Sequence, residues 1–131
     1  MNEKTGILLL GHGSTRPHNR ELVENMAEMI ANQKNVLVRT AFLNMDKPDL
    51  KDGLESFKGT GIDRIVALPL FLAHGVHTLE DIPEELNLGD DKKAVVDIDG
   101  TSVEVLYAEP LGADPRIADI AYSRAEEALA R

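Results

Sequence analysis

The segment Ile7-Leu8-Leu9-Leu10-Gly11-His12-Gly13-Ser14 decides how this chain is expected to fold. Its four apolar residues stop at a glycine, a pattern typical of a short strand that is buried on both faces. One face of the next segment then collects the apolar residues Leu22, Val23, Met26, Ala27, Met29 and Ile30. The pattern predicts a strand, a tight turn and a helix, with Ser14 or Thr15 as N-cap and Pro17 in the first turn.

The same alternation continues along the chain. Apolar runs at 36–43, 65–72 and 103–108 predict three more strands, and periodic apolar positions predict helices over 48–59, 78–86 and 115–129. Alternating strands and helices of this kind indicate a parallel sheet with helices on both faces. We therefore expect an α/β fold of three layers, α/β/α, with a four-stranded parallel sheet in a single domain of residues 1–131.

Three local patterns refine this expectation. Thr78 and Asp81 have the spacing of a capping box, which predicts a helix that begins at Thr78. Asp114-Pro115 is a good N-cap and first-turn pair for the last helix. Asp99-Gly100 lies between two valine-rich segments within a polar, acidic stretch, which predicts a small β-hairpin before the last strand.

Composition narrows the classes of function. The chain has 23 acidic and 14 basic residues, for a net charge of −9, and its aromatic content is 4%. Nucleic-acid binding needs a basic face and stacking rings, so a nucleic-acid partner is not expected. The absence of cysteine excludes disulfides and thiolate metal sites. The longest apolar run, Val66 to Ala73, is eight residues long, and we expect a cytoplasmic protein with no membrane partner.

Histidines follow two of the predicted strands. In open parallel sheets ligands bind beyond the carboxyl ends of the strands, and His12, His74 and His77 all lie there. Neutral imidazole binds Co²⁺, Ni²⁺, Zn²⁺ and Fe²⁺, so a metal site is one interpretation. The other is structural: His12 would cap a turn, His74 would pack under its loop and His77 would cap the next helix. Glu80 and Asp81 would either be first-turn acids that the helix dipole favours, or would attract a cation or orient His77.

Three other motifs that follow a buried strand do not match the segment from Gly11 to Arg16. Arg16 stands where a dinucleotide-binding fingerprint would need its third glycine, and no phosphate-binding lysine follows. The segment also lacks the Gly-x-Ser-x-Gly pattern of a nucleophile elbow. A histidine phosphatase would carry an arginine in place of Gly11 to clamp the phosphate.

Together these segments resemble a known family. Gly11-His12-Gly13-Ser14, the run from Pro69 to His77, and Glu80-Asp81-Ile82-Pro83 are similar to the motifs of class II chelatases. The exit segment from Glu109 to Asp114, followed by Arg116-Ile117, also resembles theirs. The likeness covers nearly the whole chain and is to the short archaeal CbiX-type sirohydrochlorin cobaltochelatases and nickelochelatases. Unlike some of these proteins, the chain has no histidine-rich stretch at 87–100.

The resemblance implies that the chain inserts Co²⁺ or Ni²⁺ into sirohydrochlorin, a tetrapyrrole with eight carboxylates. His12 and His77 would be the catalytic residues and the metal ligands, and no cofactor would be permanently bound. The expected substrate-binding residues are Ser14, Arg16, Arg20, His74, Gly75, Val76 and Arg116. Two alternatives stay open: a sirohydrochlorin ferrochelatase for sirohaem, and a non-catalytic carrier of metal or tetrapyrrole.

A single domain of this size offers one crevice, whereas the macrocycle is wide and flat. Ligand sites bury most of their ligand, commonly at domain interfaces, and two-fold dimers are the commonest soluble oligomers. We therefore expect a homodimer with a shared cleft. Leu79, Ile82 and Leu86 are candidate interface residues, although each also fits a core position.

Overall fold

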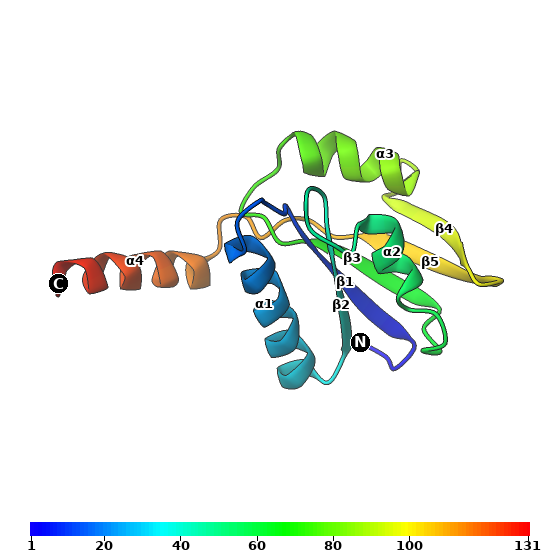
Figure 1. Ribbon diagram of the computed structural model, residues 1–131, viewed down its shortest axis with the longest axis horizontal. Coiled ribbons are helices and arrows are strands. Elements are labelled where there is room, and N and C mark those ends of the chain that lie inside the picture. Colours follow the sequence, from blue (N-terminus) through cyan, green and yellow to red (C-terminus); the bar gives the residue numbers. More distant parts are fainter.

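The computed structural model describes residues 1–131, which form one mixed sheet with helices around it (Figure 1). The strands are β1 (Thr5–Gly11), β2 (Leu37–Phe42), β3 (Arg64–Pro69), β4 (Lys93–Ile98) and β5 (Thr101–Tyr107). The helices are α1 (His18–Lys34), α2 (Leu50–Glu55), the π-helix η1 (His77–Asp81), α3 (Ile82–Leu86) and α4 (Pro115–Leu129). No helix is long and apolar enough to cross a membrane.

The sheet has the strand order β2-β1-β3-β5-β4. The first four strands in this order, β2, β1, β3 and β5, are parallel to one another, and β4 pairs antiparallel with β5. The α/β fold is therefore confirmed, but the sheet has five strands rather than four. The predicted hairpin provides the fifth strand: Asp99 and Gly100 both have positive φ, at 52° and 84°, as a two-residue hairpin turn of type I′ requires.

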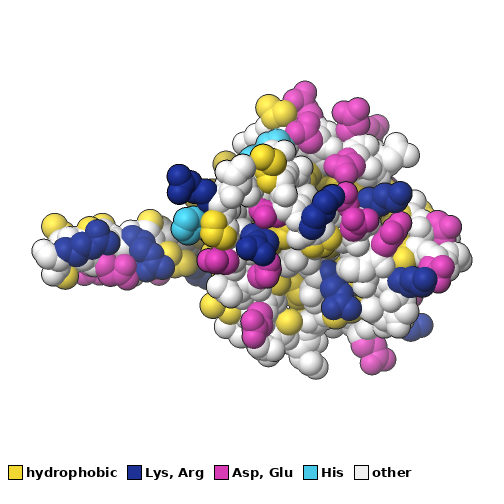
Figure 2. Space-filling view, viewed as in Figure 1, with side chains coloured by type: hydrophobic (Ala, Val, Ile, Leu, Met, Phe, Trp, Pro, Cys, Tyr) yellow, Lys and Arg dark blue, Asp and Glu magenta, His cyan; other side chains and the backbone are white.

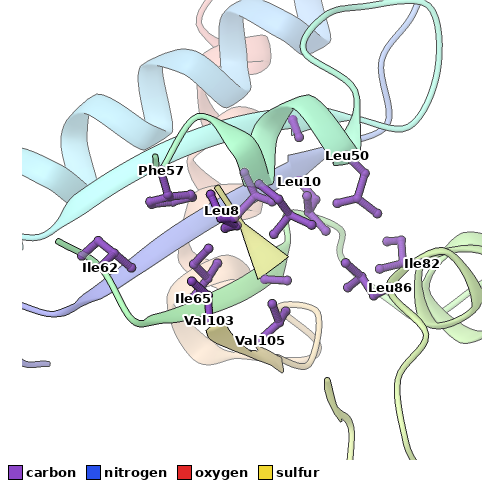
Figure 3. Packing of buried hydrophobic residues seen from close by; sticks show 14 residues of the cluster. Leu8, Leu10, Leu50, Phe57, Ile62, Ile65, Ile82, Leu86, Val103 and Val105 are labelled. Atoms are coloured by element: carbon purple, nitrogen blue, oxygen red, sulfur yellow. The ribbon is translucent and has the colours of Figure 1, made fainter. Parts of the chain in front are cut away.

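One face of the sheet is closed by α2 and α3 (Figure 3). Leu8, Leu10, Ile65 and Val105 supply fully buried side chains from the strands. The two helices contribute Leu50, Leu54, Ile82 and Leu86 to the same cluster of 14 buried residues. Ile82 and Leu86 are thus core residues, and only Leu79 of the three candidate interface residues is exposed.

The opposite face is covered by α1 over β1 and β2 only. Val23 and Ala27 of α1 pack with Leu9 and Phe42 in a separate cluster of four buried residues. A Cβ at Gly11 would lie 2.6 Å from Cγ2 of Val23, so the close approach of α1 to β1 depends on this glycine. The β3–β5–β4 half of this face has no helix over it.

The last helix does not cover the sheet, so α1 alone supplies the expected helical layer on the second face. Asp114 caps α4 as predicted, because its side chain accepts a hydrogen bond from the backbone N–H of Arg116. No residue of α4 is buried, and the helix projects from the body of the molecule (Figure 1). The linker explains this direction: Leu111 and Gly112 donate backbone hydrogen bonds to Phe71 and Leu72, which carries the chain past the edge of the sheet.

Two of the predicted helix starts are wrong. The N-cap of α1 is Pro17, with no side-chain cap, because the hydroxyl of Ser14 accepts from the N–H of Arg16 within the preceding turn. Thr78 does not form a capping box with Asp81, since its buried hydroxyl accepts from the N–H of Gly75 instead. The helical segment begins one residue earlier, at His77, and its first turn is a π-helix.

Candidate functional site

Two imidazoles meet at the carboxyl edge of the sheet. His12 follows β1, His77 opens η1, and their Nε2 atoms are 3.0 Å apart although the residues are 65 positions apart in sequence. The rings meet edge to face, with centroids separated by 4.7 Å and planes at 77°. Both side chains reach the surface, His12 more than His77, so the two nitrogen atoms converge at a place open to ligands.

The other ring nitrogen of each histidine is already engaged. Nδ1 of His12 lies 3.0 Å from the carbonyl oxygen of Gly13, and Nδ1 of His77 lies 2.7 Å from a carboxylate oxygen of Asp81. A carbonyl and a carboxylate can only accept, so each Nδ1 carries the proton and donates it. In the neutral rings both Nε2 atoms are then unprotonated. Two lone pairs that face each other at this distance repel, and a cation between them, either a proton or a metal ion, removes the repulsion.

The spacing suits a metal ion. With metal–nitrogen bonds of about 2.1 Å, the usual Zn–imidazole length, nitrogen atoms 3.0 Å apart subtend about 90° at the metal. That angle belongs to neighbouring positions of an octahedral or tetragonal site, the geometries that suit Ni²⁺ and Cu²⁺ among others. No group of three or more His, Asp or Glu side chains is placed to hold a metal. The chain therefore offers two ligands and leaves the other coordination positions open.

The surroundings of the pair are apolar. A shallow pocket of about 210 Å³ opens beside the rings, lined by His12, Phe71, Ala73, Gly75, Val76, His77 and Thr78. Val76 of this lining is more than 60% exposed, as are Leu72 and Leu79 in the same segment of the chain. Pockets for drug-sized ligands hold about 300–1,000 Å³, so this pocket alone covers only part of a large flat ligand.

His74 belongs to a different cluster. Its Nε2 is 2.5 Å from a carboxylate oxygen of Glu109, and its Nδ1 is 3.0 Å from the hydroxyl of Thr78. Lys92 donates to the other carboxylate oxygen of Glu109 at 2.6 Å. The hydrogen bonds from Lys92 and then from His74 hold the pKa of Glu109 below its ordinary value. This cluster ties the start of η1 to the ends of β4 and β5 and does not contact His12 or His77.

The loop that carries His12 is fixed by two polar side chains. Gly13 has a φ of +81°, and a Cβ there would overlap the carbonyl group of Asn44, so no other residue fits. The N–H of Gly13 donates to Asn19 of α1 at 2.8 Å. The N–H of Ser14 donates to Asp46 at 3.0 Å, and Arg20 lies 3.8 Å from the same carboxylate. The carboxylate of Asp46 thus already contacts the N–H of Ser14 and the guanidinium of Arg20, the two groups that were expected to bind a substrate carboxylate.

The remaining predicted residues lie at different distances from the pair. Gly75 and Val76 line its pocket. Arg16 is exposed on the His12 loop, and its guanidinium has no hydrogen bond or ion pair within the chain. The guanidinium of Arg116 makes two hydrogen bonds to Asp114 at the base of α4, which hold the pKa of Asp114 well below its usual range. Glu80 is exposed and has no polar contact with either histidine.

Four residues of this region had no role assigned from the sequence: Asn19, Asp46, Lys92 and Glu109. Asp46 and Glu109 do lie directly after predicted strands, so their position at the carboxyl edge was a usable signal. Lys92 and Asn19 do not directly follow a predicted strand, because Lys92 precedes an antiparallel strand and Asn19 is in a helix.

Comparisons with known proteins agree with the fold and identify the family. The CbiX family model matches residues 6–128, so the chain belongs to the CbiX family of class II chelatases that the motifs resemble. It is 46% identical over 130 residues to the sirohydrochlorin cobaltochelatase of Methanosarcina barkeri, covering 98% of this chain and all of that one. The cobaltochelatase of Methanothermobacter thermautotrophicus is 36% identical, with 96% of this chain and 94% of that chain covered.

Two solved structures show the same architecture. A CbiX protein from Marinobacter aquaeolei VT8 has a TM-score of 0.71 and 27% identity, with 97% of this chain and 98% of that chain aligned. The sirohydrochlorin chelatase SirB from Bacillus subtilis subspecies spizizenii, in complex with cobalt, has a TM-score of 0.76 and 25% identity. The alignment with SirB covers 95% of this chain but 50% of SirB, so this chain corresponds to half of that protein.

Proposed function

We propose that residues 1–131 act as one chelatase domain that inserts Co²⁺ into sirohydrochlorin. The observation that carries the proposal is the pair of Nε2 atoms of His12 and His77, 3.0 Å apart at the ligand-binding edge of the sheet. The names of the similar proteins support the substrate and the metal, because the relatives at 46% and 45% identity are sirohydrochlorin cobaltochelatases. A cytoplasmic location stays a prediction from the sequence.

The chemistry follows from the donor atoms. Metal insertion replaces two pyrrole N–H protons of the macrocycle with one divalent cation. Both Nε2 atoms hold the entering ion, which is substrate here and not a resident cofactor. When the ion moves to the ring nitrogens, the two Nε2 lone pairs become free and can take up the two protons. Two imidazoles thus match the proton count of the reaction in one subunit.

Asp81 makes this cycle easier at His77. Its carboxylate accepts from Nδ1 at 2.7 Å, which fixes the ring orientation and leaves Nε2 free for a metal ion or a proton. When Nε2 takes up a proton, the same carboxylate stabilises the imidazolium. Gly13 accepts from His12 through a neutral carbonyl, which supplies orientation without a full charge.

Substrate binding must overcome the net charge of −9, since sirohydrochlorin is a polyanion. The free guanidinium of Arg16, on the loop of His12, is the best placed carboxylate partner because nothing in the chain competes for it. The apolar side chains of Leu72, Val76 and Leu79 supply a surface for the flat macrocycle. Ser14, Arg20 and Arg116 would act only after releasing the carboxylates of Asp46 or Asp114.

We further propose that the working unit is a homodimer whose two carboxyl edges enclose the macrocycle. The small volume of the pocket and its exposed apolar rim support a second wall. The match of this chain to half of SirB supports the same arrangement, in which a second copy takes the place of the other half.

Iron is the second candidate metal. A structure of SirB from Bacillus subtilis with Fe³⁺, 26% identical to this chain, keeps sirohaem formation open. The test is turnover: substoichiometric protein is mixed with sirohydrochlorin and Co²⁺, Ni²⁺ or Fe²⁺ under anoxic conditions, and the tetrapyrrole absorption is followed. We expect many equivalents of product per subunit, fastest with Co²⁺. A change limited to one equivalent would identify a carrier instead of an enzyme and would contradict the proposal.

A further inference from the structure

His77 opens a helical segment that contains a proline. The π-helix η1 passes into α3 without a break, so Pro83 lies inside one helical segment from His77 to Leu86. In a regular α-helix the ring of a proline collides with the carbonyl group four residues earlier, which here is that of Leu79. A wider turn before the proline avoids this collision. In that turn the N–H of Ile82 donates to the carbonyl of His77, five residues back.

The same proline leaves one carbonyl of the turn without a backbone partner. In the π-helical pattern the carbonyl of Thr78 would accept from the N–H of residue 83, and Pro83 has no N–H. The N–H of Ile82, the next nearest backbone donor, is already bonded to His77. Thr78 is 2% exposed, and an unpaired buried carbonyl is costly. This carbonyl therefore needs a donor from another part of the chain.

Tyr107 supplies the missing donor. Its hydroxyl donates to the carbonyl oxygen of Thr78 at 2.9 Å. Burial, and then the charge of Glu109, raise the pKa of Tyr107 to about 12, so the hydroxyl keeps its proton at neutral pH. Tyr107 is the last residue of β5 and pairs with Ala67 of β3, so the sheet fixes its position. The hydroxyl thus links the backbone of the residue after His77 to the sheet.

The π turn has few other contacts with the body of the molecule. Acidic side chains gather on the outer face of this helical segment, where Glu80, Glu84 and Glu85 are exposed (Figure 2). No backbone hydrogen bond joins η1 to a strand. The hydroxyl of Thr78 accepts from the N–H of Gly75 at 2.8 Å, a contact with the loop that directly precedes the turn. The bond from Tyr107 is therefore the one that ties the backbone of the turn to the sheet.

We propose that Tyr107 is a positioning residue for the metal site, because its hydroxyl holds the π turn where Nε2 of His77 faces Nε2 of His12. His12 follows β1 directly, and His77 is held to β5 through this bond. The distance of 3.0 Å between the two nitrogen atoms is therefore set by one rigid sheet. The role of the two imidazoles as metal ligands rests on the proposed function, whereas the contact of Tyr107 with the π turn does not.

The first test removes the hydroxyl alone. Tyr107→Phe keeps the ring and leaves the carbonyl of Thr78 without its donor. We expect the affinity for Co²⁺ alone, measured by titration calorimetry, to fall about tenfold, the lower end of the range for outer partners of metal ligands. The matched control is Tyr122→Phe, because Tyr122 is 67% exposed on α4, and it should bind Co²⁺ like the wild type. Unchanged affinity in Tyr107→Phe, or an equal loss in the control, would overturn the positioning role.

The second test separates this bond from a general loosening of the fold. Pro83→Ala provides an N–H at position 83, so the carbonyl of Thr78 has a backbone donor whether the turn stays π-helical or closes to an α-helix. Tyr107→Phe should then lower the Co²⁺ affinity by less than about twofold in a Pro83→Ala chain, since the two changes act on one carbonyl and are not additive. A tyrosine that only stabilises the fold would give the same loss in both backgrounds, and that result would overturn the proposal.

Turnover with sirohydrochlorin distinguishes this proposal from the proposed function. A wild type that binds Co²⁺ but gives no turnover would refute the proposed function, and a loss of Co²⁺ affinity in Tyr107→Phe would still support the positioning role. A wild type that turns over, together with a Tyr107→Phe variant of unchanged Co²⁺ affinity, would refute the positioning role and leave the proposed function standing.

Discussion

His77 and His74 lie three residues apart on the same edge of the sheet, but their nitrogen atoms have opposite partners. Nε2 of His77 faces Nε2 of His12, another lone pair, across 3.0 Å. Nε2 of His74 faces a carboxylate oxygen of Glu109 at 2.5 Å. The first arrangement is incomplete without a cation, whereas the second is complete as it stands.

This difference separates a chemical site from a structural one. The carboxylate of Asp81 binds Nδ1 of His77 and leaves Nε2 free, so it prepares the ring for a metal or a proton. The carboxylate of Glu109 binds Nε2 of His74, while Thr78 engages Nδ1, so both nitrogen atoms are used. The role of each imidazole is thus decided by which ring nitrogen its acidic neighbour takes.

The largest effect is expected from removing either member of the pair. His12→Ala and His77→Ala should each lower kcat/KM for cobalt insertion by about 100-fold or more, the range of a lost acid–base group. Neither side chain is buried in the core, so the melting temperature should change little. Steady-state kinetics and a thermal melt check both statements. A variant of either residue with near wild-type turnover would contradict the assignment.

A smaller effect is expected from Asp81→Asn. The amide keeps the size of the side chain but cannot stabilise an imidazolium, so activity or metal affinity should fall by about 10-fold to 100-fold. The exposed Glu80→Gln is the matched control, because Glu80 has no polar contact with either histidine. Kinetics across a range of pH and Co²⁺ concentration separates the two. Equal losses in both variants would indicate a simple charge effect.

His74→Gln should change kcat/KM by less than about threefold, which is under about 1 kcal/mol of barrier. Its imidazole contacts Glu109 and Thr78 instead of the pair, so the change should appear in the thermal melt before it appears in turnover. Glu109→Gln should behave in the same way. If His74→Gln were as inactive as His77→Ala, the separation of the two clusters would be wrong.

The smallest effect concerns the structural cluster at high pH. Burial, and then the charge of Glu109, raise the pKa of Tyr107 from 10.0 to about 12, and its hydroxyl donates to the carbonyl of Thr78 at 2.9 Å. Because the folded state favours the neutral phenol, this stabilisation is fully present below about pH 10 and is lost as pH rises through about 12. The chain has two tyrosines, so a Tyr122→Phe variant leaves Tyr107 alone. Its tyrosinate absorption should appear near pH 12. A titration midpoint near pH 10 would contradict the raised pKa of Tyr107.

The sequence predicted the order of the elements because short apolar runs and helical periodicity are local signals. It predicted the carboxyl-edge position of His12 and His77 because the carboxyl ends of parallel strands lie at the same edge of a sheet. It did not predict that α4 projects from the body of the molecule, since an amphipathic stripe does not say which surface a helix contacts. It also did not predict the ion pairs of Arg20 with Asp46 and of Arg116 with Asp114, because such pairs depend on loop geometry.

The proposed chemistry depends most on the two Nε2 atoms of His12 and His77 as the ligands of the entering metal. X-ray absorption of the protein loaded with one equivalent of Co²⁺ counts imidazole ligands directly. We expect two imidazole nitrogens at about 2.1 Å in the wild type and in His74→Gln. In His77→Ala we expect one. An unchanged imidazole count in His77→Ala, or a cobalt ion bound by carboxylates alone in the wild type, would contradict the assignment of His12 and His77 as metal ligands.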